Sequence, residues 1–348
     1  FQSNEQLYSL LIKMHNGYQV SINPISSGWI NSTYEVEYEG KKYILQKINT
    51  HVFPQPEVIS NNIDIISRHL KAKNYQNSII EIVKDLQGNL LAKEDGEIWR
   101  MTSFIPNSIC FEKVESAEQA YEAAKTISEF HSYLLDVNVD EIHPSIVGFL
   151  DYHKRVNDFK NALKNALTER LEETKEEVAY ILDNLHQVEK YLEIDFPKRV
   201  VHADAKISNF LFNNDNHSQA IAVIDWDTIM PGNILCDFGD MIRTYANLKA
   251  EDDPNPEKLF EPDYYKAVKN GFLEHLKYDL QPIEIENMDF VAYIVIYIQA
   301  VRFLADYLEN DIYYSISYPK QNLNRTINQI NLLKALTKFH EENSVREI

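Results

Sequence analysis

Apolar and polar positions alternate in short runs through the first hundred residues, and turn residues separate the runs. A period of two is typical of strands that bury one face. It predicts strands over residues 18–25, 32–38, 42–48, 79–85 and 97–102, a helix over 58–70 and a short helix near 5–14. We therefore expect the amino-terminal part to be an antiparallel sheet with one long helix.

From residue 116 onward, apolar residues recur with the 3.6-residue period of amphipathic helices. The predicted helices cover residues 117–136, 153–168, 175–192, 262–276, 288–309 and 323–341. One interruption stands out, because two short apolar runs, 210–213 and 220–224, flank turn-forming residues. This pattern predicts a β-hairpin within an otherwise helical region.

The change of pattern near residues 100–106 predicts two lobes, 4–102 and 103–348, in an α+β fold. The first three residues resemble the remnant of a cleaved purification tag and are left out of the first lobe. The longest apolar stretch, 290–301, is shorter than the ~20 residues of a bilayer span. We expect it to be a buried helix, and not a membrane anchor.

The net charge and the cysteine content argue against several classes of function. The chain has 34 Lys and Arg against 53 Asp and Glu, a net charge of −19, which argues against nucleic acid or an anionic membrane as a partner. Its two cysteines, Cys110 and Cys236, form neither a disulfide framework nor a zinc motif. A cytoplasmic location is expected.

Polar residues bracket the predicted hairpin. His202, Asp204 and Asn209 precede it, and Asp225 and Asp227 follow it. Because a hairpin returns its second strand to the start of the first, Asp225 should lie beside Asp204 and Asn209. Phosphoryl transfer needs a carboxylate to accept the proton of an acceptor hydroxyl, and oxygen ligands to hold Mg²⁺. The spacing H-x-D-x-x-x-x-N is that of a kinase catalytic loop.

Residues 202–209 followed by Asp225 resemble the catalytic loop and metal aspartate of the aminoglycoside phosphotransferase and choline kinase superfamily, whose members have a protein-kinase-like two-lobed fold. The resemblance implies that Asp204 is the catalytic base, that Asn209 and Asp225 bind Mg²⁺, and that His202 braces the loop. Residues 28–34, 44–49, 224–232 and 302–308 are also similar to segments of N-acetylhexosamine 1-kinases.

Three nearby residues have more than one interpretation. His202 is expected to be a structural histidine, because no second His or Cys stands at zinc-ligand spacing. Asp227 either contacts a second Mg²⁺ or solvates the loop. Asp237 begins a run that spells the protein-kinase metal motif, but its position favours capping of a following helix.

Nucleotide contacts are expected from the amino-terminal part. The turn 26–32, with Gly28, Asn31 and Ser32, could place backbone N–H groups over the ATP phosphates. Met101 and Phe104 belong to the 100–106 connection, against which we expect the adenine to lie.

Gln46 and Lys47 are the candidates for the strand residue that holds the phosphates. Period-two alternation sends them to opposite faces, so only one faces the nucleotide. Charge favours Lys47; with Gln46 in that place, the chain would depart from the usual superfamily chemistry. Glu57 either pairs with the lysine or simply stands near a helix start, and the second is favoured.

Arg243, Arg302, Tyr313 and Tyr314 are the candidate acceptor-binding residues. Arg302 stands among apolar residues, so it needs a partner. That partner is either Asp306, one helical turn on, or a sugar hydroxyl or acetamido oxygen.

The resemblance implies ATP and Mg²⁺ as cofactors and a small-molecule sugar as partner. The expected reaction transfers phosphate to the anomeric hydroxyl of N-acetylglucosamine or N-acetylgalactosamine. The alternatives are a kinase of an aminoglycoside, choline or homoserine, and a pseudokinase that binds nucleotide only. The sequence does not determine the oligomeric state.

Overall fold

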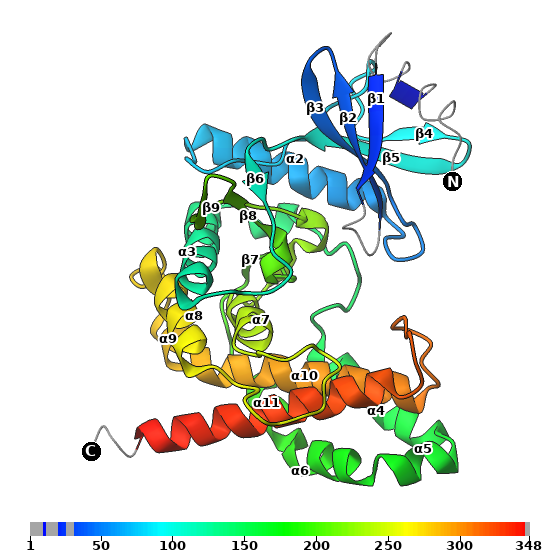
Figure 1. Cartoon of the computed structure of the whole chain (residues 1–348), viewed down its shortest axis with the longest axis vertical. Helices are drawn as coiled ribbons and strands as arrows, with labels where there is room; N and C mark the ends of the chain where they lie inside the picture. The colour runs from blue at the N-terminus through cyan, green and yellow to red at the C-terminus, as the bar shows by residue number, and fades with distance from the viewer. Residues whose placement is uncertain (1–9, 12–19, 26–30, 345–348) are drawn as a thin grey trace. The chain divides into compact units, whose positions relative to one another are not determined.

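The computed structural model describes residues 10–11, 20–25 and 31–344 (Figure 1). The chain forms two compact units. The first unit comprises Phe1–Cys110, Tyr133–Val147 and Asn209–Pro231, and the second comprises Phe111–Ser132, Gly148–Ser208 and Gly232–Ile348. This division differs from the two expected lobes, whose boundary after residue 102 stays a prediction.

A five-stranded antiparallel sheet dominates the first unit, in the order β1-β2-β3-β5-β4. The strands are β1 (Val20–Ile25), β2 (Ser32–Tyr38), β3 (Lys41–Lys47), β4 (Ala92–Glu94) and β5 (Glu97–Ser103). Its buried face packs Val36, Leu45, Trp99 and Met101 into one core. The turn between β2 and β3 has positive φ at Glu39 and Gly40, which is the backbone of a tight two-residue hairpin.

The prediction of a strand over residues 79–85 is wrong. This segment forms one isolated bridge with β5, between Ile82 and Thr102, flanked by two backbone hydrogen bonds: Val83 N to Met101 O and Ser103 N to Glu81 O, both at 2.8 Å. Toward the start of the segment the Ser103 hydroxyl takes the place of a further ladder bond, since it accepts from Glu81 N at 3.0 Å and donates to Ile79 O at 3.3 Å. Pairing ends at a turn in which Asp85 accepts hydrogen bonds from the next backbone N–H groups.

Helix α2 (Pro56–Ala72) forms the long helix of the first unit and begins two residues before the predicted start. Pro56 occupies its first turn, where a missing N–H costs nothing. Residues at intervals of three and four form its buried stripe: Ile59, Ile63, Ile66 and Leu70.

The predicted hairpin is confirmed as β8 (Phe210–Asn213) and β9 (Asn216–Val223). Strand β6 (Ser108–Ile109) adds to its edge and gives the order β6-β8-β9. Strand β9 begins four residues earlier than predicted, so the connecting turn is shorter. This small sheet belongs to the first unit.

Helices make up most of the second unit. They are α3 (Ala117–Leu134), α4 (Tyr152–Asn165), α5 (Thr168–Glu173), α6 (Lys175–Leu192), α7 (Leu235–Tyr245), α8 (Pro262–Glu274), α9 (Pro282–Glu286), α10 (Met288–Leu308) and α11 (Gln321–Ser344). The six helices predicted from periodicity all form. The short helices α5 and α9 were not predicted, because five or six residues are too few to show a period.

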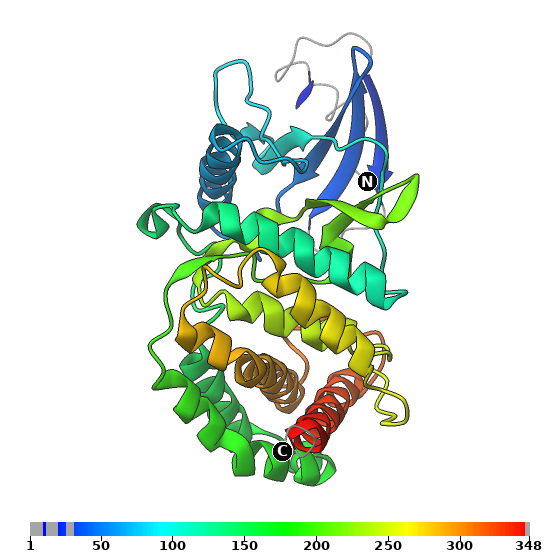
Figure 2. The same ribbon diagram turned by 90° about the vertical axis from the view of Figure 1, so that its left-hand side faces the viewer.

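Helix α10 is the core helix of this unit. By length and composition it could cross a membrane, but 67% of its apolar window is buried. It packs against α4, α7 and α11, and Figure 2 shows these helices around it. Gly239 of α7 allows the close approach, because a Cβ there would lie 2.7 Å from Val295 Cγ2. The expectation of a buried helix is confirmed.

Candidate active site

The catalytic-loop segment is held by one buried carboxylate in the second unit. Asp237 accepts hydrogen bonds from the backbone N–H groups of His202 and Ala203, both at 2.7 Å. Its Oδ2 also lies 2.9 Å from Nε2 of His131. Asp237, His131 and His202 are all at most 1% exposed. Ala203 is held with a φ of 65°, a left-handed conformation that is costly for alanine.

Asp237 does not cap a helix, so that expectation is wrong. Helix α7 begins at Leu235, its cap position Ile234 makes no side-chain bond, and Asp237 lies within the first turn. Burial alone would raise the pKa of this carboxyl, but the hydrogen bond and charge of His131 hold it below its ordinary 3.8. Asp237 is therefore an ionised anchor for the loop.

Asp204 lies just beyond this anchored turn. Its backbone N–H donates to His202 Nδ1 at 3.3 Å, so the histidine contacts the loop from within, as the resemblance implied. Its carboxylate pairs with Lys206 Nζ at 2.9 Å, and the Asp204 side chain is 29% exposed. Lys206 was not singled out from the sequence, although it stands inside the motif. The carboxylate is thus accessible and accompanied by a cation.

Asn209 and Asp225 lie at the open end of the hairpin in the first unit. Phe210 pairs with Val223, and Ile224 N donates to Asn209 O at 2.8 Å, so the fold-back expected from the sequence is present in the backbone. Asn209 is 4% exposed, whereas Asp225 is exposed and has a φ of 58°. Asp204 belongs to the second unit, five residues before Asn209, and its place beside these two stays a prediction.

Asn209 and Asp225 suit Mg²⁺ chemically. Mg²⁺ prefers oxygen ligands and is usually held by one or two protein groups together with substrate phosphates. Within the described ranges, no group of three or more His, Cys, Asp and Glu side chains is arranged to hold a metal. The donor set therefore fits a metal that shares its ligands with a nucleotide better than an all-protein metal cage.

Asp227 is buried in a polar cluster of the first unit. Its Oδ1 lies 2.7 Å from Nη1 of Arg100, and its Oδ2 accepts a hydrogen bond from Asn31 Nδ2 at 2.9 Å. Asn31 Oδ1 accepts in turn from Asn49 N at 2.9 Å. The expectation that Asp227 solvates the loop is wrong, because the side chain is 3% exposed. A metal-binding role for it stays a prediction and would compete with Arg100.

The register of the sheet places Gln46 and Lys47 on opposite faces, as the alternation predicted. Gln46 pairs across the strands with Thr33 and Arg100, and its Oε1 accepts from Arg100 Nη2 at 2.6 Å. Lys47 projects to the other face, where its Nζ lies 3.4 Å from Glu97. Gln46 is therefore the one that faces the Arg100–Asp227 cluster, and the preference for Lys47 as the phosphate-binding residue stays a prediction. Glu57 lies in the first turn of α2, as favoured.

The remaining candidates for nucleotide binding differ in whether their side chains are accessible. Gly28 lies outside the described residues, and Ser32 is the first residue of β2. The Met101 side chain is 1% exposed in the sheet core, so an adenine contact through this side chain is not available. Phe104 is half-buried, with Lys42 Nζ 5.4 Å from its ring centre.

Arg302 occupies an aromatic environment in the second unit. Its guanidinium carbon lies 5.4 Å, 5.9 Å and 5.5 Å from the ring centres of Phe149, Tyr313 and Tyr314. Its Nη1 donates to Gln299 Oε1 at 3.1 Å. The ion pair with Asp306 does not form, because that carboxylate accepts instead from the backbone N–H groups that follow α10.

Arg243 is bonded to two carboxylates of the protein itself. Its guanidinium bonds Asp240 at 2.9 Å and Glu251 at 2.8 Å. Burial lowers the pKa of an arginine, but these two carboxylates outweigh burial and raise it. A substrate role for Arg243 stays a prediction, and its visible role is structural.

The chain matches a known enzyme family over most of its length. Residues 21–265 match the model of the APH family, described as a phosphotransferase enzyme family. The chain belongs to this family. The matched region contains the anchored loop, the hairpin and the buried Arg100–Asp227 cluster.

Solved phosphotransferases share the fold over nearly the whole chain. A spectinomycin phosphotransferase in complex with ADP and spectinomycin is 15% identical, with a TM-score of 0.65, over 96% of this chain and 98% of that one. An aminoglycoside phosphotransferase from Alicyclobacillus acidocaldarius is 13% identical, with a TM-score of 0.63, over 96% of each chain. A microcompartment-associated aminopropanol kinase is 12% identical, with a TM-score of 0.60, over 98% of each chain. The expected α+β, kinase-like fold is confirmed.

Proposed function

We propose that this phosphotransferase is an ATP-dependent small-molecule kinase that phosphorylates the anomeric hydroxyl of N-acetylglucosamine or N-acetylgalactosamine. The observation that carries the kinase proposal is the loop 202–204, which is fixed by the ionised Asp237 with Asp204 left accessible. In this proposal the hairpin residues Asn209 and Asp225 hold Mg²⁺ against the nucleotide phosphates.

In the proposed reaction, Asp204 orients the acceptor hydroxyl and takes its proton as the new O–P bond forms. The bond between the γ-phosphorus and the bridging oxygen breaks, and ADP leaves with that electron pair. When bound, Mg²⁺ neutralises charge on the phosphates. Lys206, 2.9 Å from Asp204, contributes a positive charge beside the reacting groups. Positioning and charge stabilisation supply most of the rate enhancement in such reactions.

The surroundings of Arg302 support a sugar as the acceptor. Its planar guanidinium has N–H groups beyond the one bonded to Gln299, and neutral acetamido or hydroxyl oxygens are suitable acceptors. Tyr313 is 61% exposed and offers a ring surface on which the apolar face of a sugar can pack. The similarity of residues 302–308 to N-acetylhexosamine 1-kinases points to the same substrate class.

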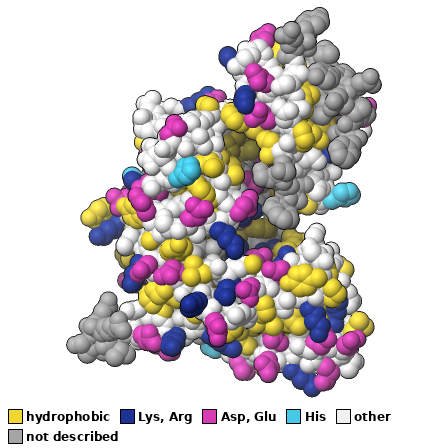
Figure 3. Space-filling model, in the orientation of Figure 1, with side chains coloured by type: hydrophobic (Ala, Val, Ile, Leu, Met, Phe, Trp, Pro, Cys, Tyr) yellow, Lys and Arg dark blue, Asp and Glu magenta, His cyan; other side chains and the backbone are white. Residues whose placement is uncertain are grey.

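A cationic alcohol is the second candidate. The chain carries a net charge of −19, which attracts a positively charged acceptor over distance. On the face shown in Figure 3, acidic and basic side chains are interspersed. Two of the structurally similar proteins are an aminoglycoside phosphotransferase and an aminopropanol kinase.

An acceptor panel tests the proposal. Purified protein with ATP and Mg²⁺ is offered both N-acetylhexosamines, spectinomycin, kanamycin, choline and homoserine, and ADP release is measured. We expect turnover with at least one hexosamine and formation of its 1-phosphate. Turnover only with a cationic alcohol would show that the acceptor is such an alcohol and not a hexosamine. Mg²⁺-dependent stabilisation by ATP, without turnover on any acceptor, would indicate a pseudokinase.

A further inference from the structure

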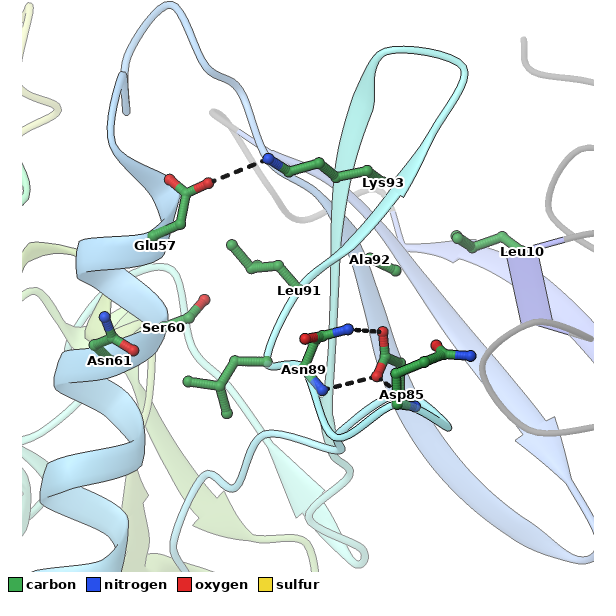
Figure 4. A pocket seen from close by; sticks show the side chains of 11 residues that line it. Leu10, Glu57, Ser60, Asn61, Asp85, Asn89, Leu91, Ala92 and Lys93 are labelled. Atoms are coloured by element: carbon green, nitrogen blue, oxygen red, sulfur yellow. Dashed lines mark hydrogen bonds and ion pairs between the residues drawn. The ribbon is translucent and has the colours of Figure 1, made fainter.

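The first unit contains a cavity that none of the proposed reaction residues lines. It has a volume of about 550 Å³ and lies between α2 and residues 85–93 (Figure 4). Small-molecule sites in proteins typically have volumes of roughly 300–1,000 Å³. The cavity is therefore large enough for a ligand of its own.

A buried hydroxyl faces this cavity. Ser60 of α2 is 1% exposed, and its Oγ has no hydrogen-bond partner among the described residues. Serine and threonine within helices commonly bond back to a carbonyl of the preceding turn, as Thr126 does to Glu122 O at 2.8 Å. Ser60 makes no such bond, and its hydroxyl points from the helix toward the segment opposite (Figure 4). Buried polar groups are nearly always hydrogen-bonded, so this one is available to a ligand.

The charged groups around the cavity already have partners within the protein. Glu57 lies 3.6 Å from Lys93, and Asp85 accepts hydrogen bonds from Gln87 N at 2.9 Å and from Asn89 N at 2.7 Å. These pairings leave neutral groups to recognise a ligand, since a bound ion would have to displace an existing partner. The chemistry therefore favours an uncharged ligand.

The lining also has an apolar side. Leu91, which is half-buried, points toward α2 and its Ser60 hydroxyl (Figure 4). A ligand that matches this cavity needs hydroxyl groups on one side and C–H surface on the other. Sugars and related polyols have this composition.

We propose that the cavity binds an uncharged polyhydroxylated molecule of mono- to disaccharide size, with one ligand hydroxyl bonded to Ser60 Oγ. None of its lining residues is a candidate acceptor-binding residue of the proposed kinase reaction. The proposal therefore does not depend on the catalysed reaction.

Trehalose and methyl α-D-glucoside are suitable probes. Neither has a free anomeric hydroxyl, so neither can be the acceptor in the proposed reaction. Binding to the full chain is measured by saturation-transfer NMR and by calorimetric titration. The first variant is Ser60→Ala, which removes the hydroxyl and creates no clash. The second is Leu91→Trp, which fills the cavity from a half-buried position. Arg68→Ala is the matched control, because Arg68 lies on the same helix and its side chain is 69% exposed.

We expect at least one probe to bind the wild type, Ser60→Ala to weaken that binding about fivefold, as loss of one hydrogen bond does, and Leu91→Trp to abolish it. The control should bind as the wild type does. Absence of binding by both probes would overturn the proposal. Wild-type affinity in both Ser60→Ala and Leu91→Trp would do the same, and circular dichroism confirms that each variant is folded.

Discussion

The guanidinium of Arg100 lies 2.7 Å from the carboxylate of Asp227, and both side chains are only 3% exposed. Two opposite charges are therefore removed from water together, and each depends on the other for compensation. The pair joins strand β5 to the segment that follows the hairpin and carries Asp225.

Substitution Arg100→Met should destabilise the protein by about 3–5 kcal/mol, because it leaves the Asp227 carboxylate buried without its cation. Urea unfolding of the purified variant measures the loss. Lys154→Ala is the control, since it breaks an exposed pair with Asp158, and it should cost less than ~1 kcal/mol. A loss as small as the control's would show that the buried pair contributes nothing.

Substitution Asp204→Asn should leave folding intact and reduce turnover by roughly 10²–10⁴-fold, the usual scale of general-base catalysis. The side chain is partly exposed and of the same size, so the unfolding midpoint should stay close to that of the wild type. Steady-state kinetics on the best acceptor of the panel give the rate. Wild-type turnover would remove Asp204 from the mechanism.

Substitution Asp237→Asn should lower kcat more than it changes the KM for ATP, because Asp237 positions the loop without touching the substrate. The amide can accept on one atom only, so a buried N–H of the loop loses its partner, at a cost of about 1–3 kcal/mol. Kinetics and urea unfolding test both effects. Asp158→Asn, at an exposed position, provides the control and should change neither.

The Asp237 carboxyl also predicts a pH dependence. Because its pKa in the folded protein lies below the ordinary 3.8, its contribution to the free energy of unfolding is complete above pH ~4. As the pH falls below 3.8, the unfolded chain takes up the proton first, and the contribution disappears through the lower folded pKa. The stability difference between the wild type and Asp237→Asn should therefore shrink between pH 4 and pH 3. An unchanged difference over this range would contradict the lowered pKa.

The two cysteines should differ sharply toward thiol reagents. Cys110 is exposed, whereas Cys236 is buried and burial raises its pKa to about 12. At pH 8 only about one in ten thousand Cys236 side chains would be the reactive thiolate. Titration with a chromogenic disulfide should therefore detect one fast thiol in the native protein and two after denaturation. Two fast thiols in the native state would show that Cys236 is accessible.

Periodic features of the chain were predictable because they are encoded locally. Helices α6 and α10 were placed nearly to the residue, since apolar positions recur every three or four residues. The hairpin around Asn209 and Asp225 was predicted from two apolar runs and a turn. The motif spacing then placed candidate chemistry at its open end.

The supporting contacts were not predictable, because their partners lie far apart in the sequence. Asp237 bonds groups 34, 35 and 106 residues away, whereas its immediate neighbours suggested a helix cap. Charge alone favoured Lys47 over Gln46, and only the observed register shows which face carries Arg100. In both cases, contacts between residues distant in the sequence supply the information that the local sequence lacks.

The left-handed backbone at Ala203 links the shape of the catalytic loop to the packing of α7. Alanine has no intrinsic tendency toward this shape, so the segment adopts it only when α7 has docked and presents the Asp237 carboxylate. Partly folded chains would therefore lack a shaped loop around Asp204. A change in α7 that moves Asp237 should therefore also deform the Asp204 loop, even where it leaves the loop sequence untouched.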